Sequence, residues 1–108
     1  MQLSDEHLAV IRSILLRHFG PRKIKVYLFG SRISEEATRA SDLDILLENS
    51  EPISLGKLGM LKDTFETSDL PFKVDLLDAH RTDETMKRNI LRSAEPLSLG
   101  TDPHGDGS

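Results

Sequence analysis

Residues 28–32 read LFGSR, and after a polar spacer residues 41–45 read SDLDI. The first segment ends the run IKVYLF at residues 24–29, whose β-branched and aromatic residues predict a strand. The second segment opens another apolar run at residues 43–48, which predicts a second strand. A glycine-serine turn thus follows one predicted strand, and a pair of aspartates begins the next.

The sequence around these two strands predicts helices that alternate with strands. The other predicted elements are a helix from the N-cap Ser4 to Gly20-Pro21, a short helix around residues 35–37, a helix over residues 54–65, a strand over residues 72–77 and a last helix capped by Thr82. This alternation predicts an α/β fold, a small mixed sheet of three or more strands flanked by helices.

Length and composition narrow the classes of protein. The 108 residues suit one domain, expected over residues 1–100, with residues 101–108 as a disordered tail. The formal charge of -4 argues against nucleic acid as the main partner. Cysteine is absent, which excludes thiolate metal sites and suits a reducing cytoplasm. No apolar run approaches the ~20 residues that span a bilayer, and the N-terminal residues do not resemble a signal peptide. We therefore expect a soluble, cytoplasmic protein.

The turn at Gly30-Ser31 has the chemistry of an anion site. A strand that ends in Gly-Ser points backbone N–H groups and a hydroxyl at one spot, and glycine lets a phosphate approach the backbone. Arg32 could contact a phosphate with two parallel hydrogen bonds. A surface ion pair between Arg32 and Glu35 or Glu36 is an equally good interpretation.

The aspartates predict a metal site. Asp42 and Asp44 are two residues apart on a strand, so their carboxylates share a face while Leu43 faces the core. Like charges so placed are unfavourable unless a cation lies between them, and carboxylate oxygens suit Mg²⁺. Asp75 on the third predicted strand would complete a site for two ions. Asp42 and Asp44 could instead be ordinary solvated residues, since a lone Asp-x-Asp usually is.

Other polar residues are given structural roles. Asp78, three residues after Asp75, is expected to begin a loop rather than to serve as a fourth ligand. The histidines lack the spacing of metal ligands; they are His7, His18, His80 and His104.

Together these residues resemble the signature of the polymerase β nucleotidyltransferase superfamily. They are Gly30-Ser31, a ten-residue spacer, Asp42-Leu43-Asp44 and a later Asp75. The short chain is similar to the minimal nucleotidyltransferases (MNT type) over about residues 5–97. The resemblance implies the polymerase β-type nucleotidyltransferase fold.

The resemblance also implies roles for the site residues. In that family the carboxylates that match Asp42 and Asp44 hold both Mg²⁺ ions, and the one that matches Asp75 joins the catalytic ion and helps to activate the attacking hydroxyl. Gly30 and Ser31 match positions that hold the triphosphate of ATP. Many members have a second glycine where this chain has Glu35.

Minimal members commonly pair with a HEPN-domain ribonuclease as a toxin–antitoxin module, in which the transferase moves AMP onto a tyrosine of the toxin. The resemblance therefore implies a protein adenylyltransferase that forms a hetero-oligomer with its toxin. The short chain, with no room for a second substrate-gripping domain, favours an acceptor on a partner protein. Two alternatives stay open. The first is a non-catalytic antitoxin that acts by occlusion, which Glu35 in place of the family glycine suggests. The second is transfer to a small molecule or RNA.

Overall fold

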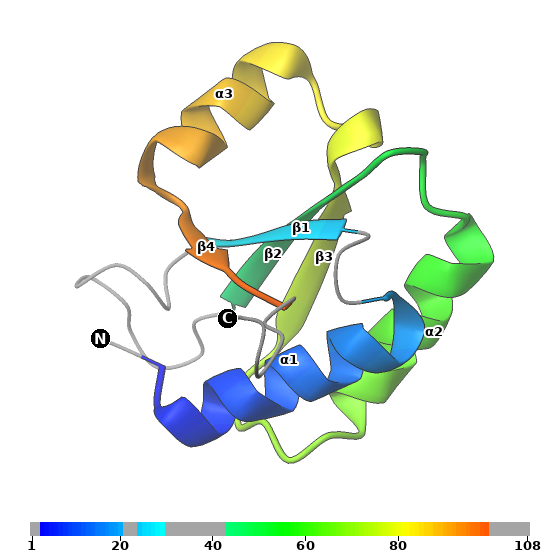
Figure 1. Cartoon of the computed structure of the whole chain (residues 1–108), viewed down its shortest axis with the longest axis vertical. Coiled ribbons are helices and arrows are strands. Elements are labelled where there is room, and N and C mark those ends of the chain that lie inside the picture. The colour runs from blue at the N-terminus through cyan, green and yellow to red at the C-terminus, as the bar shows by residue number, and fades with distance from the viewer. Residues whose placement is uncertain (1–2, 21–23, 30–42, 100–108) are drawn as a thin grey trace, which may run out of the picture.

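The computed structural model describes residues 3–20, 24–29 and 43–99. In chain order the elements are α1 (Asp5–His18), β1 (Ile24–Phe29), β2 (Leu43–Asn49), α2 (Leu55–Glu66), β3 (Val74–Asp78), the 3-10 helix η1 (Ala79–Arg81), α3 (Glu84–Ser93) and β4 (Glu95–Leu97). Helices α1 and α2 lie on one side of the sheet, and α3 lies on the other (Figure 1). The α/β prediction is confirmed.

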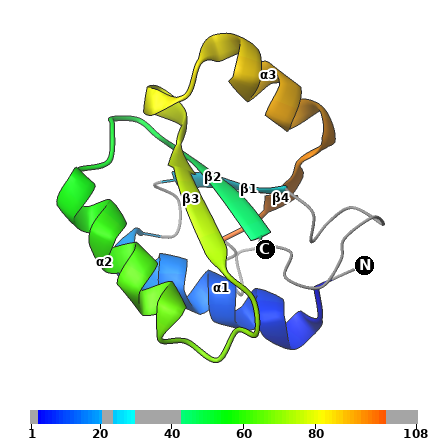
Figure 2. The same cartoon turned by 180° about the vertical axis from the view of Figure 1, so that it is seen from behind.

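The sheet has four strands in the order β3-β2-β1-β4 and is mixed. Strand β1 runs antiparallel to both β2 and β4, whereas β2 and β3 are parallel. Parallel neighbours need a crossover connection, and α2 supplies it, as the view from behind shows (Figure 2). This parallel pairing is what places the starts of β2 and β3 side by side.

Each face of the sheet packs on its own core. Val26, Ile45 and Val74 belong to the core shared with α1 and α2. Leu46 belongs to a smaller core with Ile90 of α3. Because successive strand residues point to opposite faces, β2 is buried on both sides and its middle is continuously apolar, as expected for a central strand.

The first helix begins and ends where its sequence predicts. The Ser4 hydroxyl accepts a hydrogen bond from the backbone N–H of His7 at 3.0 Å, which satisfies one donor of the first turn. His18 is the last helical residue, and Phe19 is buried directly after it. The apolar stripe of the helix, which includes Ile11 and Leu15, packs on the sheet.

The third strand differs from the prediction of residues 72–77. It begins at Val74, because the pairing with β2 starts at Leu43, and it continues through Asp78. Lys73 precedes the strand, although its carbonyl still accepts from the Leu43 N–H at 2.9 Å.

The start of α3 was also predicted wrongly. Its N-cap is Asp83, whose carboxylate accepts from the N–H groups of Thr85 and Met86 at 3.1 and 3.3 Å. Thr82 ends η1 instead, and its hydroxyl donates to the Asp78 carbonyl at 2.8 Å. An aspartate satisfies two donors of the first turn here, which leaves the preceding threonine free for another contact.

Strand β4 has no counterpart in the sequence prediction. It pairs with the middle of β1 and buries Leu97. The short helix predicted around residues 35–37 and the tail at residues 101–108 lie outside the described residues. None of the helices in the described ranges is long and apolar enough to cross a membrane.

Candidate active site

Two of the predicted site residues, Asp44 on β2 and Asp75 on β3, occupy matched positions of neighbouring strands. Both strands run in the same direction, so both side chains point to the face that carries Leu46 and Leu77. Neighbouring strands lie about 4.8 Å apart. The two carboxylates are therefore within reach of one shared cation.

The flanking residues explain why these carboxylates are held in place. Leu43 and Ile45, on either side of Asp44, have no exposed surface, and Val74 before Asp75 is buried as well. Packing of these apolar neighbours on the opposite face fixes the backbone of both strands. Asp44 is consequently half-buried, whereas Asp75 is exposed.

An open groove of about 430 Å³ adjoins the pair at the edge of the sheet. We call it the α2–β3 groove, and its lining residues are Asp44, Leu58, Gly59, Lys62, Asp75, Leu76 and Leu77. Helix α2 forms one wall and β3 the other. Lys62 brings a cation to a groove whose other charged residues are both acidic.

The donor set of this pair fits a divalent cation. Two ionised carboxylates on one face repel each other unless a positive charge lies between them, and Mg²⁺ takes such hard oxygen ligands. Among the described residues there is no group of three or more acidic, histidine or cysteine side chains able to hold a metal ion. The third predicted ligand, Asp42, lies outside them, as do Gly30, Ser31, Arg32 and Glu35.

Asp78 belongs to a different, structural cluster. It is the last residue of β3 and caps η1, so the strand runs one residue further than predicted, and Asp78 does not begin a loop. It is only 4% exposed, and it is paired in register with Leu47, on the face opposite to Asp75. This orientation separates Asp78 from the acidic pair, in agreement with its exclusion as a ligand.

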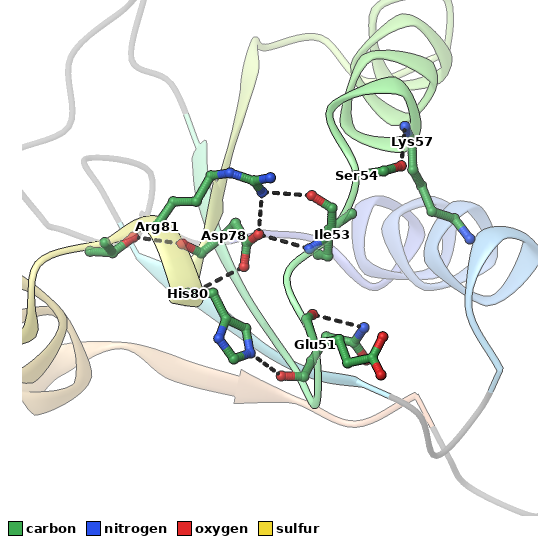
Figure 3. Close-up of polar contacts among 9 residues, drawn as sticks. Glu51, Ile53, Ser54, Lys57, Asp78, His80 and Arg81 are labelled. Carbon is green, nitrogen blue, oxygen red and sulfur yellow. Dashed lines mark hydrogen bonds and ion pairs between the residues drawn. The ribbon is translucent and has the colours of Figure 1, made fainter.

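The Asp78 carboxylate is fully satisfied by its neighbours (Figure 3). It accepts from the backbone N–H groups of Ile53 and His80 at 2.9 and 3.0 Å, and it forms an ion pair with Arg81. Arg81 also donates to the Ile53 carbonyl at 2.6 Å. The cluster therefore fastens the end of β3 to the segment that leads into α2. The only indication of this role in the sequence is that an aspartate can accept from the backbone N–H two residues later, as in a turn.

Two histidines have structural contacts that explain them. A ring nitrogen of His80 lies 2.8 Å from the Asn49 carbonyl, and the His7 ring packs edge-on against Phe72. His18 ends α1, and His104 lies outside the described residues.

The chain matches the family model "Polymerase beta, Nucleotidyltransferase" over residues 11–99. It therefore belongs to the polymerase beta nucleotidyltransferase family. A Haemophilus influenzae protein named "Probable protein adenylyltransferase MntA" is 38% identical over 92 residues, which cover 85% of this chain and 78% of the relative. A Methanocaldococcus jannaschii relative, also described as a protein adenylyltransferase, is 40% identical over 65% of this chain and 76% of its own length.

Solved structures share the fold. A crystal structure of a toxin–antitoxin with AMP-PNP superposes with a TM-score of 0.70 at 25% identity, covering 90% of this chain and 76% of that chain. A mutant of the MntA-HpeT toxin–antitoxin complex superposes with a TM-score of 0.69 at 21% identity, covering 90% and 75% of the two chains. At that identity the second likeness shows the fold alone.

Proposed function

We propose that this chain is a protein adenylyltransferase that moves AMP from Mg-ATP onto a hydroxyl group of a partner toxin and acts as its antitoxin. The observation that carries the proposal is the matched register of Asp44 and Asp75 at the starts of two parallel strands in a nucleotidyltransferase domain. The acceptor is a tyrosine of a HEPN-type toxin, and the two proteins form a hetero-oligomer in the cytoplasm.

We assign a separate role to each of the candidate site residues. Asp42, Asp44 and Asp75 would hold two Mg²⁺ ions. Bound there, the ions would supply positive charge to the attacking and leaving oxygens of an in-line displacement. Asp75 is on β3, an edge strand of the sheet, and it would orient the incoming hydroxyl and accept its proton. Gly30 and Ser31 bind the triphosphate through backbone N–H groups and a hydroxyl, and Arg32 contacts a phosphate oxygen.

Two observations on similar proteins and one on this chain support the choice of substrates. Two relatives are described as protein adenylyltransferases. One solved structure of similar fold is a toxin–antitoxin with AMP-PNP, an ATP analogue, which supports ATP as the nucleotide. The groove beside the acidic pair is open to solvent over exposed residues of α2, so a large acceptor can reach it.

The test is transfer of label from ATP. The chain is incubated with Mg²⁺, ATP labelled in its α-phosphate and the toxin encoded by the neighbouring reading frame. Labelled toxin is the expected product, and Asp44→Asn should lose at least about two orders of magnitude in rate, because it weakens preorganised charge stabilisation. Glu48→Gln is a matched control, since Glu48 lies on the same strand and face four residues away. Equal labelling by wild type and Asp44→Asn would refute the proposal.

A second candidate is an antitoxin that neutralises its toxin by binding alone. The replacement of a common family glycine by Glu35 motivates it, because an acidic side chain near a triphosphate is unfavourable. Co-expression of the toxin with Asp44→Asn separates the two candidates. Continued growth would favour occlusion, whereas growth arrest would favour catalysis.

A further inference from the structure

The strand order gives the acidic pair two different sides. Strand β1 lies beside β2 on one side, and β3 lies on the other and forms an edge of the sheet. Phe29, the last residue of β1, pairs with Asp44, and Gly30 follows Phe29 directly in the sequence. The segment proposed to bind the triphosphate therefore begins, in the sequence, directly after the end of β1.

Transfer chemistry then assigns the opposite side to the acceptor. In phosphoryl and nucleotidyl transfer the attacking and leaving oxygens lie roughly in line through the phosphorus. If pyrophosphate leaves toward β1, the hydroxyl oxygen must form its new bond to the α-phosphorus from the β3 side. Beyond β3 lies the α2–β3 groove, which already contains Asp75.

The α2 wall of this groove offers clearance. A Cβ atom added to Gly59 would meet no heavy atom within 4 Å, so the glycine is not required by packing inside the chain. Glycine inside a helix costs about 1 kcal/mol relative to alanine. Leu58, Leu76 and Leu77 also line the groove, so its wall is partly apolar. A partner backbone could therefore lie directly against α2.

Lys62 supplies a positive charge to the lining of the groove. It lines the α2–β3 groove together with Asp75, and it also lines the adjacent hollow with Phe72 and Lys73. An ammonium group beside the acidic pair can donate to carbonyl or carboxylate oxygens of an incoming chain.

From this arrangement we propose that the α2–β3 groove receives the segment of the partner protein that carries the acceptor hydroxyl. Gly59 provides the space for its backbone, and Lys62 donates a hydrogen bond to it. The occupant is a polypeptide rather than the nucleotide, because β1, the strand that precedes the proposed triphosphate segment in the sequence, is on the other side of β2 from the groove. This inference rests on the proposed function.

The experiment compares two glycines of the same helix. Gly59→Gln fills the groove, whereas Gly56→Gln adds the same side chain one turn earlier, where an added Cβ also meets nothing within 4 Å and no groove residue is changed. Both variants should unfold at or above the temperature of the wild type, because glutamine favours the helix.

The readout is the rate of toxin labelling as a function of toxin concentration and, separately, of ATP concentration. For Gly59→Gln the KM for the toxin should rise about tenfold or more, the factor that corresponds to a clash of about 1.4 kcal/mol, while the KM for ATP stays unchanged. Gly56→Gln should behave like the wild type. Lys62→Gln should also raise the KM for the toxin. Its control is Lys25→Gln, which changes an exposed lysine of β1 and should leave this KM unchanged.

The outcomes separate the two proposals. Absence of labelling by the wild type would overturn the proposed function and this inference with it. Labelling by the wild type together with an unchanged toxin KM in Gly59→Gln would overturn the inference alone. A rise in the KM for ATP instead would show that the groove belongs to the nucleotide, which also overturns the inference.

Discussion

Asp44 and Asp75 place two carboxylates at directly matched positions of neighbouring strands. Directly opposite like charges on neighbouring strands destabilise a sheet by a fraction of a kcal/mol. A cation bound between the two carboxylates would offset this repulsion. At the scale of single residues, the pair is thus better explained by binding than by stability.

The first prediction follows from this repulsion. Replacement of Asp75 by Asn keeps the shape of the side chain and removes one charge, so without Mg²⁺ the variant should be as stable as the wild type or up to about 1 kcal/mol more stable. Transfer activity should be lost in the same variant. Urea unfolding in the presence of a chelator measures the first effect. A large loss of stability would mean that Asp75 has a structural role instead.

Asp78 is the opposite case, a buried carboxylate whose partners are all within the chain. Asp78→Ala would leave Arg81 and the N–H groups of Ile53 and His80 without their acceptor. Because Arg81 is partly exposed, water offsets some of the loss, and we expect a destabilisation of about 2–3 kcal/mol. Urea unfolding tests this, with the exposed Asp69→Ala as a control expected to fall within about 0.5 kcal/mol of the wild type. Equal stability of the two variants would contradict the anchoring role.

At the scale of elements, local signals in the sequence predicted those parts that local physics determines. The N-cap Ser4 begins α1, the helix ends at His18, shortly before the glycine-proline pair of the sequence, and the alternation of residues 24–29 gives β1 its two faces. The start of β3 depends instead on where β2 begins to pair, which is a contact between segments. Strand β4 is three residues long and contains Pro96, so only its pairing with β1 at the sheet edge makes it a strand.

The cap of α3 gives a prediction at this scale. Asp83→Ala removes the carboxylate that accepts two N–H groups of the first turn, and it should cost about 1 kcal/mol. Chemical denaturation measures the change. Asp83→Asn, which keeps an acceptor oxygen and is an equally good N-cap, should restore most of the stability. If Thr82→Ala cost as much as Asp83→Ala and Asp83→Asn gave no recovery, the assignment of the cap would be wrong.

At the scale of the whole molecule, helices pack on both faces of the sheet, and the acidic pair lies at the end where β2 and β3 begin. Helices α1 and α2 cover one face and α3 covers part of the other, while the starts of β2 and β3 carry the acidic pair beside the groove. The sequence motif predicted which carboxylates face the same way, and the structure brings Asp44 and Asp75 together. The motif could not predict that Gly59 and Lys62 line the groove, because only the packing of α2 against the β3 edge brings them beside Asp75. Asp42, Gly30, Ser31 and Arg32 stay predictions.

The last prediction concerns the stability of the molecule as a whole. A ligand that binds only the folded chain stabilises it by mass action, by about 2.7 kcal/mol at a concentration of 100 Kd. For a domain of this size that corresponds to a rise in Tm of roughly 10–20 °C. Mg²⁺ with AMP-PNP should produce such a rise without any transfer.

The rise should depend on both components, because the proposed function has the carboxylates bind the nucleotide through metal ions. Thermal unfolding followed by circular dichroism measures it, with a chelator expected to abolish the effect and Asp44→Asn expected to weaken it strongly. Mg²⁺ alone should raise the Tm less, since this ion keeps much of its water unless substrate phosphates share it. An equal rise with nucleotide and chelator would place the nucleotide away from the acidic pair, and the assignment of Asp44 and Asp75 as metal ligands would then have to be given up.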